Sequence, residues 1–440
     1  MRILQITAGA GGMYCGSCLL DNALATELLA RGHDVLLLPV YTPTLTDEDN
    51  VSDGHVFFGG ISVYLEQHVP LFRKTPAFLD RLWDAAPVIR AATGRGVSVE
   101  PHSLGELTVS TLKGEAGYQA KEFRKLLGHL EHLPPFDLVI LPNSLLISMA
   151  PPLRRALKRP ILCSLQGEDL FLESLDEPHR TQSKELIRRH ASAVDGFVAA
   201  SDYYADFMAS LLGLDRGAIH PVPIGINLEG HGAEETERAG PFTIGYLARV
   251  VPEKGLHQLA ETYRILRLER GLAEGRLEVA GYLAPEHRAY LEETRQRMRA
   301  WGLEAEFQYH GTLDRKDKIA FLRSLDVLSV PSPYAEPKGL YVLEALANGV
   351  PCVQPRHGAF PELLGRTGGG LLFEPNDTGG LAERLLGLAA DREGTRELGR
   401  RGAEGVRRHH SIARMADRAL EVYRSVTGET SQADSACATA

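Results

Sequence analysis

The sequence predicts an α/β protein with two successive domains, each containing a parallel sheet covered by helices. The chain has 440 residues, which is too long for one ordinary core and favours two domains of about 200 residues each. It opens with the order strand, glycine-rich turn, helix, strand. A second series of short apolar strands alternating with helical patterns begins at Phe242. Such alternation is typical of parallel sheets.

The opening segment predicts a βαβ unit. Residues 2–7 form an apolar strand, which runs into Gly9, Gly11 and Gly12. A helix with leucines at every fourth position follows, and a second apolar strand occupies residues 35–40. These glycines lack the third glycine of the dinucleotide-binding fingerprint at its proper offset, so the turn does not favour an NAD site.

The rest of the first domain, residues 1–228, is expected to add strands at 136–142, 160–165 and 196–201. Residues 42–117 are less regular and are interpreted as an insertion on the substrate side of a cleft. Residues 229–240 are rich in Gly and Glu without an apolar period, which predicts an interdomain linker.

The second domain, residues 241–405, repeats the strand–helix pattern. Its strands are expected at residues 242–246, 276–280, 306–310, 327–330, 350–354 and 371–373. Ligands of such sheets lie beyond the carboxyl ends of the strands. A C-terminal helix is predicted at residues 406–428, and the small, polar residues 429–440 predict a flexible tail.

Composition and charge argue against several classes of function. The net charge of −9 argues against a nucleic-acid-binding surface. No stretch approaches the roughly 18 apolar residues of a membrane span, and the first apolar run is too short for a signal peptide. Five cysteines do not form a disulfide framework, so a cytoplasmic location is expected. A basic cluster leaves weak membrane-surface contact open, although a solvated helix face is the commoner explanation: Arg154, Arg155, Lys158 and Arg159.

Two carboxylates, Glu336 and Glu344, form the main candidate site. They lie eight positions apart, with Gly339 between them and a helical pattern that begins near Leu340. Eight helical positions span roughly 12 Å, which is similar to the reach of a diphosphate flanked by two sugars. The start of the helix would offer N–H groups to phosphates. The alternative is that both are ordinary solvated acids near a helix start.

Two cations follow the first strand of the second domain. Arg249 and Lys254 lie in the turn between that strand and the next helix. Their charges would neutralise a diphosphate, Arg through a fork of donors and Lys as a point charge. Ordinary surface basic residues are the alternative.

Together these residues resemble the family-four glycosyltransferases, the glycosyl transferases group 1. The resemblance rests on the spacing of the two acids, the spacing of Arg249 and Lys254, and the sequence Gly349-Val350-Pro351, in this order. It covers nearly the whole chain and is strongest from Phe242 to Leu364. The resemblance implies the GT-B fold, in which two Rossmann-like domains face each other across a cleft.

The resemblance also implies a function. A member of this family would be a retaining, metal-independent hexosyltransferase that uses a nucleotide sugar, with a saccharide, lipid or small-molecule acceptor held mainly by the N-terminal domain. Glu344 would hold the ribose hydroxyls, Glu336 would lie beside the donor sugar, and Arg249 and Lys254 would bind the diphosphate. The remaining donor contacts implied by the family are Gly11, Gly12, Gln166, Leu313, Lys338, Gly339 and Leu340.

Gln166 departs from the family pattern. Many members carry a histidine after the strand that here ends at Leu165, where it touches the donor sugar. Glutamine forms hydrogen bonds but does not titrate. Three alternatives follow: His68, Glu168 or Asp169 supplies a proton-transferring group, the leaving phosphate takes the acceptor proton, or catalysis is impaired.

Cys15 and Cys18 form a second departure, a C-x-x-C directly after the glycine turn. They are tolerated thiols, a redox-sensitive pair, or two of the four ligands that a structural zinc needs. Three alternatives to a transferase therefore stay open: a non-catalytic nucleotide-sugar-binding protein, a sugar phosphorylase of the same fold, and a redox protein.

Overall fold

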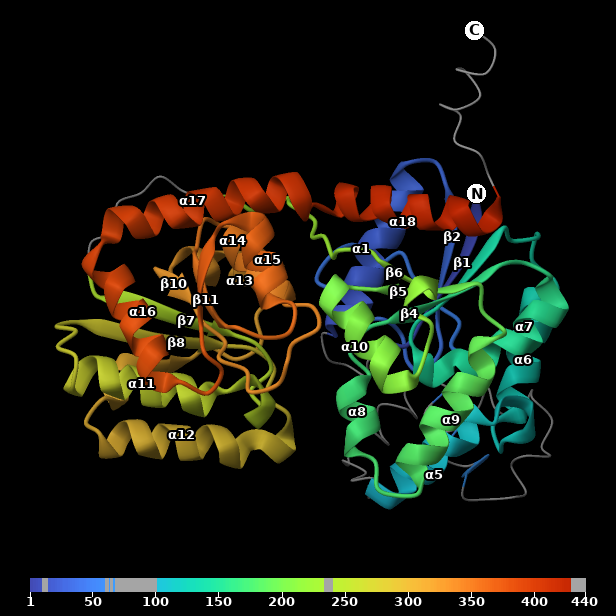
Figure 1. Ribbon diagram of the computed structural model, residues 1–440, viewed down its shortest axis with the longest axis horizontal. Helices are drawn as coiled ribbons and strands as arrows, with labels where there is room; N and C mark the ends of the chain where they lie inside the picture. Colours follow the sequence, from blue (N-terminus) through green and yellow to red (C-terminus); the bar gives the residue numbers. More distant parts are fainter. Residues whose placement is uncertain (10–14, 60–62, 64–65, 68–100, 233–239, 429–440) are drawn as a thin grey trace, which may run out of the picture. The chain divides into compact units, whose positions relative to one another are not determined.

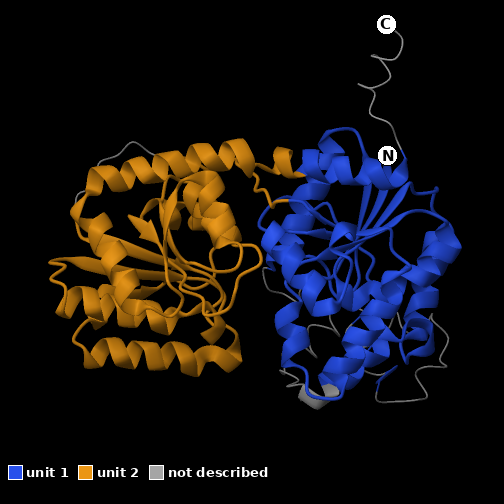
Figure 2. Cartoon of the chain, viewed as in Figure 1, with its two compact units in different colours: residues 1–222, 416–440 blue, residues 223–415 orange. Residues whose placement is uncertain are grey.

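A computed structural model describes residues 1–9, 15–59, 63, 66–67, 101–232 and 240–428 (Figure 1). The chain forms two compact units (Figure 2). The N-terminal unit contains Met1–Val222 and the segment that begins at Ala416, and the C-terminal unit contains Pro223–Met415.

The N-terminal unit contains a six-stranded sheet in the order β2-β1-β3-β4-β5-β6, in which every pair is parallel. The strands are β1 (Arg2–Thr7), β2 (Asp34–Pro39), β3 (Leu138–Leu141), β4 (Ile161–Leu165), β5 (Gly196–Ala199) and β6 (Ile219–Pro221). The five strands predicted here are confirmed. The edge strand β6 was not predicted, because three residues ending in proline carry little strand signal.

Helices cover this sheet and bury its apolar strands. They are α1 (Gly16–Ala30), α5 (Pro101–Leu112), α6 (Ala120–Leu130), α7 (Ala150–Leu157), α8 (Asp169–Ser174), α9 (His179–Ala191), α10 (Asp202–Leu212) and most of α18 (Ile412–Thr427). All four residues of β3 are buried, as expected for a strand covered on both faces. Within the irregular segment 42–117, the described part ends in α5 and a short turn; its role on the substrate side stays a prediction.

The C-terminal unit repeats this architecture with the sheet order β12-β11-β10-β7-β8-β9, again parallel throughout. Its strands are β7 (Phe242–Leu247), β8 (Gly275–Ala280), β9 (Phe307–Tyr309), β10 (Val327–Leu328), β11 (Cys352–Pro355) and β12 (Gly370–Phe373). Its helices are α11 (Leu256–Leu268), α12 (Arg288–Ala300), α13 (Arg315–Arg323), α14 (Leu340–Ala347), α15 (Phe360–Thr367), α16 (Thr378–Ala390) and α17 (Arg392–His409). All six strands predicted here are confirmed.

The prediction of one helix over residues 406–428 is wrong. Helix α17 ends at His409, and α18 begins at Ile412. At the break the chain pairs with an earlier segment: Ile226 donates its N–H to the carbonyl of His410 at 2.9 Å, and Ile412 donates to the carbonyl of Ile226 at 2.8 Å. These bonds replace helical ones. Because the helical pattern continues on both sides of the break, the sequence did not reveal where one helix ends and the next begins.

Among the described helices, none is both long and apolar enough to cross a bilayer.

Candidate functional site

A cluster of cations surrounds Glu336 in the C-terminal unit. Arg249 and Lys254 follow β7, and Glu336 lies in the segment between β10 and α14. Because β7 and β10 are neighbours in the sheet, their carboxyl ends bring these segments together. Lys254 Nζ forms an ion pair with Glu336 Oε2, and the two side chains are only 12% and 8% exposed.

Electrostatics keep Glu336 ionised. Burial alone would raise the pKa of this carboxyl, but Lys254, and then Lys338 and Arg249, outweigh burial and lower the pKa below its ordinary value. The structure therefore brings together four of the residues that the sequence singled out. A group of three cations in one place suits an anionic ligand.

The backbone around Glu336 depends on glycine. Gly358 has a φ of +60°, and a Cβ there would lie 2.5 Å from the carbonyl oxygen of Glu336. The neighbouring Ala359 donates its N–H to that same oxygen at 2.8 Å. Only a glycine allows this close approach, which fixes the segment that carries the acid.

Helix α14 begins beside the cluster. Gly339 is its N-cap with a φ of 72°, a left-handed conformation that favours glycine, and Leu340 is the first helical residue. The first N–H groups of a helix lack intrahelical partners and carry partial positive charge, so they add to the field of the cations. Tyr341 was missed by sequence reasoning: it is 9% exposed, and Lys254 Nζ lies 5.8 Å from its ring centre. The available signal was that Tyr341 is the one aromatic residue of α14.

Glu344 belongs to a separate ion pair. Its Oε1 accepts from Lys318 Nζ of α13 at 2.6 Å, and the side chains are 12% and 10% exposed. Glu344 is therefore not a solvated first-turn acid. Leu313 lies two residues before α13, whose N-cap is Asp314. The predicted ribose contact thus lies on α14 and the predicted base contact just before α13, and this ion pair joins the two helices. Lys318 had no distinguishing signal in the sequence.

In the N-terminal unit, Gln166 follows β4 and is held by hydrogen bonds. Its Nε2 donates to Asp21 Oδ1 at 3.0 Å, and its backbone N–H donates to Glu168 Oε2 at 2.7 Å. The predicted donor contacts Gly11 and Gly12, and the candidate His68, lie outside the described residues.

Glu168 and Asp169 have structural partners in the described part of the chain. Glu168 is 6% exposed, and its Oε1 accepts from the N–H and hydroxyl of Ser144 at 2.9 and 2.8 Å. Asp169 is 4% exposed and accepts from the hydroxyl of Tyr204 at 2.8 Å. These contacts order the loop after β4, so we assign both acids to positioning that loop.

The two cysteines of the C-x-x-C lie at the start of α1. Cys15 is the N-cap and is partly exposed, whereas Cys18 is buried. A hydrogen bond with Cys15, together with burial, raises the pKa of Cys18, which keeps it a protonated thiol. Among the residues that the structure describes, no group of three or more His, Cys, Asp or Glu side chains could hold a metal ion.

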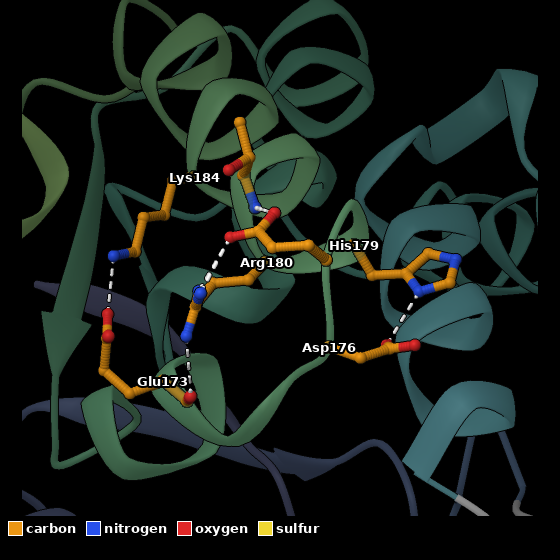
Figure 3. A network of polar contacts seen from close by, with 7 residues as sticks. Glu173, Asp176, His179, Arg180 and Lys184 are labelled. Atoms are coloured by element: carbon orange, nitrogen blue, oxygen red, sulfur yellow. Dashed lines mark hydrogen bonds and ion pairs between the residues drawn. The ribbon is translucent and has the colours of Figure 1, made fainter.

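Another polar network joins α8 to α9 (Figure 3). Lys184 Nζ lies 2.5 Å from Glu173 Oε1, and His179 Nδ1 lies 2.9 Å from Asp176 Oδ1. Most of these side chains are substantially exposed, and their charges pair with one another. The network therefore has the character of a helix-to-helix connection.

The basic cluster of α7 is partly neutralised. Arg154 forms an ion pair with Asp195, and Arg155 forms one with Glu115. These ion pairs reduce the net positive charge of the cluster, and so its attraction to an anionic membrane surface.

Comparisons with known proteins agree with this architecture. Residues 231–405 match the family model described as glycosyl transferases group 1, and residues 22–225 match the glycosyl transferase 4-like domain. The chain is 31% identical over 211 residues to an MMP α-(1→4)-mannosyltransferase of Mycolicibacterium hassiacum, covering 48% of this chain and 47% of that protein. It is 32% identical over 114 residues to an N-acetyl-α-D-glucosaminyl L-malate synthase of Bacillus anthracis, covering 26% of this chain and 30% of that protein. The matched segments thus span less than about half of these relatives' length.

Solved structures with a similar fold cover nearly the whole chain. A sucrose-phosphate synthase from Thermosynechococcus elongatus superposes with a TM-score of 0.68 at 17% identity, covering 98% of this chain and 100% of that chain. Anabaena HepE, in complex with UDP and glucose, gives a TM-score of 0.68 at 17% identity, with 97% and 100% covered. At these identities the likeness shows the fold alone. The two family matches, the two parallel sheets and these neighbours together establish that the chain belongs to the group 1, family-four type glycosyltransferases and has the GT-B fold.

Proposed function

We propose that the protein is a retaining, metal-independent glycosyltransferase that moves a sugar from a nucleotide-sugar donor to an acceptor. The observation that carries the proposal is the buried carboxylate of Glu336 among Arg249, Lys254 and Lys338. An acid beside a group of cations suits a donor whose positive charge develops at the anomeric carbon while negative charge develops on its diphosphate.

The cations and the start of α14 supply the electrostatic stabilisation in the proposed reaction. Arg249, Lys254 and Lys338 would bind the diphosphate and stabilise it as the leaving group, which is the part that a bound metal ion plays in other enzymes. Charge placed in advance where it develops in the transition state lowers the barrier more than it strengthens ground-state binding.

The proposed chemical step takes place on one face of the sugar. The bond from the anomeric carbon to the phosphate oxygen breaks, and the acceptor oxygen forms its bond on that same face, which retains configuration. The acceptor's proton passes to the departing phosphate oxygen. This route needs no titrating side chain, so it agrees with glutamine at position 166 and with the structural partners of Glu168 and Asp169.

The donor's other groups are assigned to neighbouring residues. Glu344 would hold the ribose hydroxyls through the carboxylate oxygen that does not pair with Lys318. The backbone near Leu313 would meet the base, and that from Lys338 to Leu340 the phosphates and sugar. The structure of HepE with UDP-glucose makes uridine the first base to test. We propose a cytoplasmic location, since four described cysteines carry thiols.

The test is a panel of UDP-, GDP- and ADP-sugars with saccharide, lipid and small-molecule acceptors. We expect nucleotide release that depends on an acceptor, in the presence of a metal chelator, and a product with the donor's anomeric configuration. An inverted product would refute the retaining mechanism. Thermal stabilisation by nucleotide without any sugar transfer or hydrolysis would indicate a binding protein, and release of sugar 1-phosphate that depends on inorganic phosphate would indicate a phosphorylase.

A further inference from the structure

Asp21 is a buried carboxylate in the N-terminal unit. It lies on α1 and is 8% exposed. Its two oxygens accept from different elements: Oδ2 from Thr7 Oγ1 at 2.8 Å, and Oδ1 from Gln166 Nε2 at 3.0 Å. Thr7 ends β1 and Gln166 follows β4, so Asp21 joins the carboxyl ends of two strands that are separated in the sheet by β3.

This contact determines how the carboxamide of Gln166 is oriented. In this contact Nε2 is the donor and the carboxyl oxygen is the acceptor, so the NH₂ end of the amide faces Asp21. The oxygen, Oε1, is then left as an acceptor on a side chain that is only partly buried. The backbone beneath it is fixed as well, because Gly167 donates its N–H to the hydroxyl of Tyr204 at 2.9 Å.

We propose that Asp21 is a positioning residue that holds Gln166 so that its carboxamide oxygen accepts a hydrogen bond from a hydroxyl of the sugar substrate. The inference rests on the proposed function, which supplies the sugar. It also assigns a specificity: a site built to bond a hydroxyl discriminates against the deoxy analogue, since the carboxamide oxygen, once covered by the bound sugar, then lacks a partner.

Among the residues that the structure describes, two further titratable groups are recorded next to Asp21: Cys18 on its own helix and Tyr423 on α18. A hydrogen bond with Cys15 and burial raise the pKa of Cys18, and burial raises the pKa of Tyr423. Both therefore stay neutral near neutral pH. On the neighbouring loop, Glu168 is occupied by Ser144 and the backbone of Gln166. Since Asp21 Oδ1 is the partner of the Gln166 carboxamide, a carboxyl introduced at position 166 would lie against Asp21 and respond to its charge.

The test is the variant Gln166→Glu, which places a second carboxyl against Asp21. Two carboxyls in contact keep one shared proton to a higher pH than either would alone. At low pH the protonated glutamic acid donates to Asp21 and presents its carbonyl oxygen as glutamine does. As the pH rises and this proton is lost, the two charges repel. We expect transfer kcat/KM within about threefold of wild type near pH 5.5 and at least about tenfold below it near pH 8.

The double variant Asp21→Asn/Gln166→Glu is the rescue. The Asn amide can donate to the new carboxylate, so the pH profile should return to that of the wild type. The matched control is Gln182→Glu on the exposed side of α9, which adds the same charge to the same unit and should leave the profile unchanged. If Gln166→Glu alone fails to fold at neutral pH, folding of the double variant at that pH provides the same comparison.

The melting temperature of each variant across the same pH range tests the contact without turnover. If Gln166→Glu shows no destabilisation with rising pH relative to the double variant, the pairing is wrong. A melting shift with an unchanged transfer profile overturns the positioning role and leaves the transferase standing. Absence of transfer by the wild type with every nucleotide sugar overturns both.

Discussion

Replacing Glu336 by glutamine distinguishes what its ion pair with Lys254 contributes to stability from what the carboxylate contributes to catalysis. Two unit charges about 4 Å apart attract by about 4 kcal/mol at an effective dielectric constant of about 20. Burial of the carboxylate, which alone would raise its pKa, offsets part of that attraction. We therefore expect Glu336→Gln to lower the free energy of unfolding by about 1–3 kcal/mol.

The kinetic effect should be larger and unequal. Loss of the negative charge beside the anomeric carbon should lower kcat by about 10²–10³-fold, the usual cost of removing one group aimed at transition-state charge. Binding of UDP should stay the same or tighten, because Lys254 no longer divides its charge between Glu336 and the phosphates. The measurements are kcat from nucleotide release and the UDP dissociation constant from calorimetry.

Glu306→Gln is the matched control. Glu306 also pairs with a partly buried cation, Arg267, at 2.7 Å. It precedes β9, however, and so lies at the amino ends of the parallel strands, whereas the cluster lies at their carboxyl ends. The variant Glu306→Gln should have a lower free energy of unfolding but nearly the kcat of the wild type. Equal losses of kcat and UDP affinity in Glu336→Gln would refute the role assigned to this acid.

Three further outcomes are expected. Lys318→Met should lower the free energy of unfolding, measured in urea, by about 3–5 kcal/mol, because it removes the partner of buried Glu344. The double variant Lys318→Met/Glu344→Gln should recover much of this loss. A double variant as unstable as the single one would contradict the pairing. Cys15→Ser/Cys18→Ser should retain most transfer activity, whereas abolished activity would favour the redox protein. Lys254, Lys338 and Arg249 together outweigh burial and hold the pKa of Glu336 below its ordinary 4.5, so these interactions stabilise the fold above that pH and are lost as the pH falls through the lowered value. The stability difference between wild type and Glu336→Gln should therefore be full near pH 7 and shrink in acid; a constant difference in denaturant unfolding would refute the linkage.

Local signals were enough to predict most of the fold. In β1 and β7 an apolar run ends where the chain turns, and in a parallel sheet covered by helices such runs are long enough to recognise. The edge strand β6 and the break between α17 and α18 were not predictable in this way. Both depend on pairing with distant residues, such as that of Ile226 with His410.

The same distinction applies to the candidate site. The sequence was sufficient to recognise Arg249, Lys254 and Glu336, because they lie in the turns that follow strands. Packing of the core does not require charged residues at such positions. Lys318 and Asp21 lie within helices, where a polar residue normally faces solvent. Lys318 is buried against α14, and Asp21 is buried against β1 and the loop that follows β4. No periodicity in one sequence contains that information, so these two partners appear only once the helices are placed.

The ion pair between Lys254 and Glu336 makes the proposed binding of diphosphate an exchange of partners. A phosphate that approaches Lys254 must compete with a carboxylate already in contact with it. Part of the attraction is therefore spent on separating the pair, which weakens binding of the ground state. Separation also leaves the negative charge of Glu336 unpaired when the donor sugar binds. That charge can then stabilise the positive charge that develops in the transition state. An isolated lysine would bind diphosphate more tightly but would leave the anomeric carbon without a neighbouring negative charge. The proposed enzyme thus gains rate from a contact that limits its affinity.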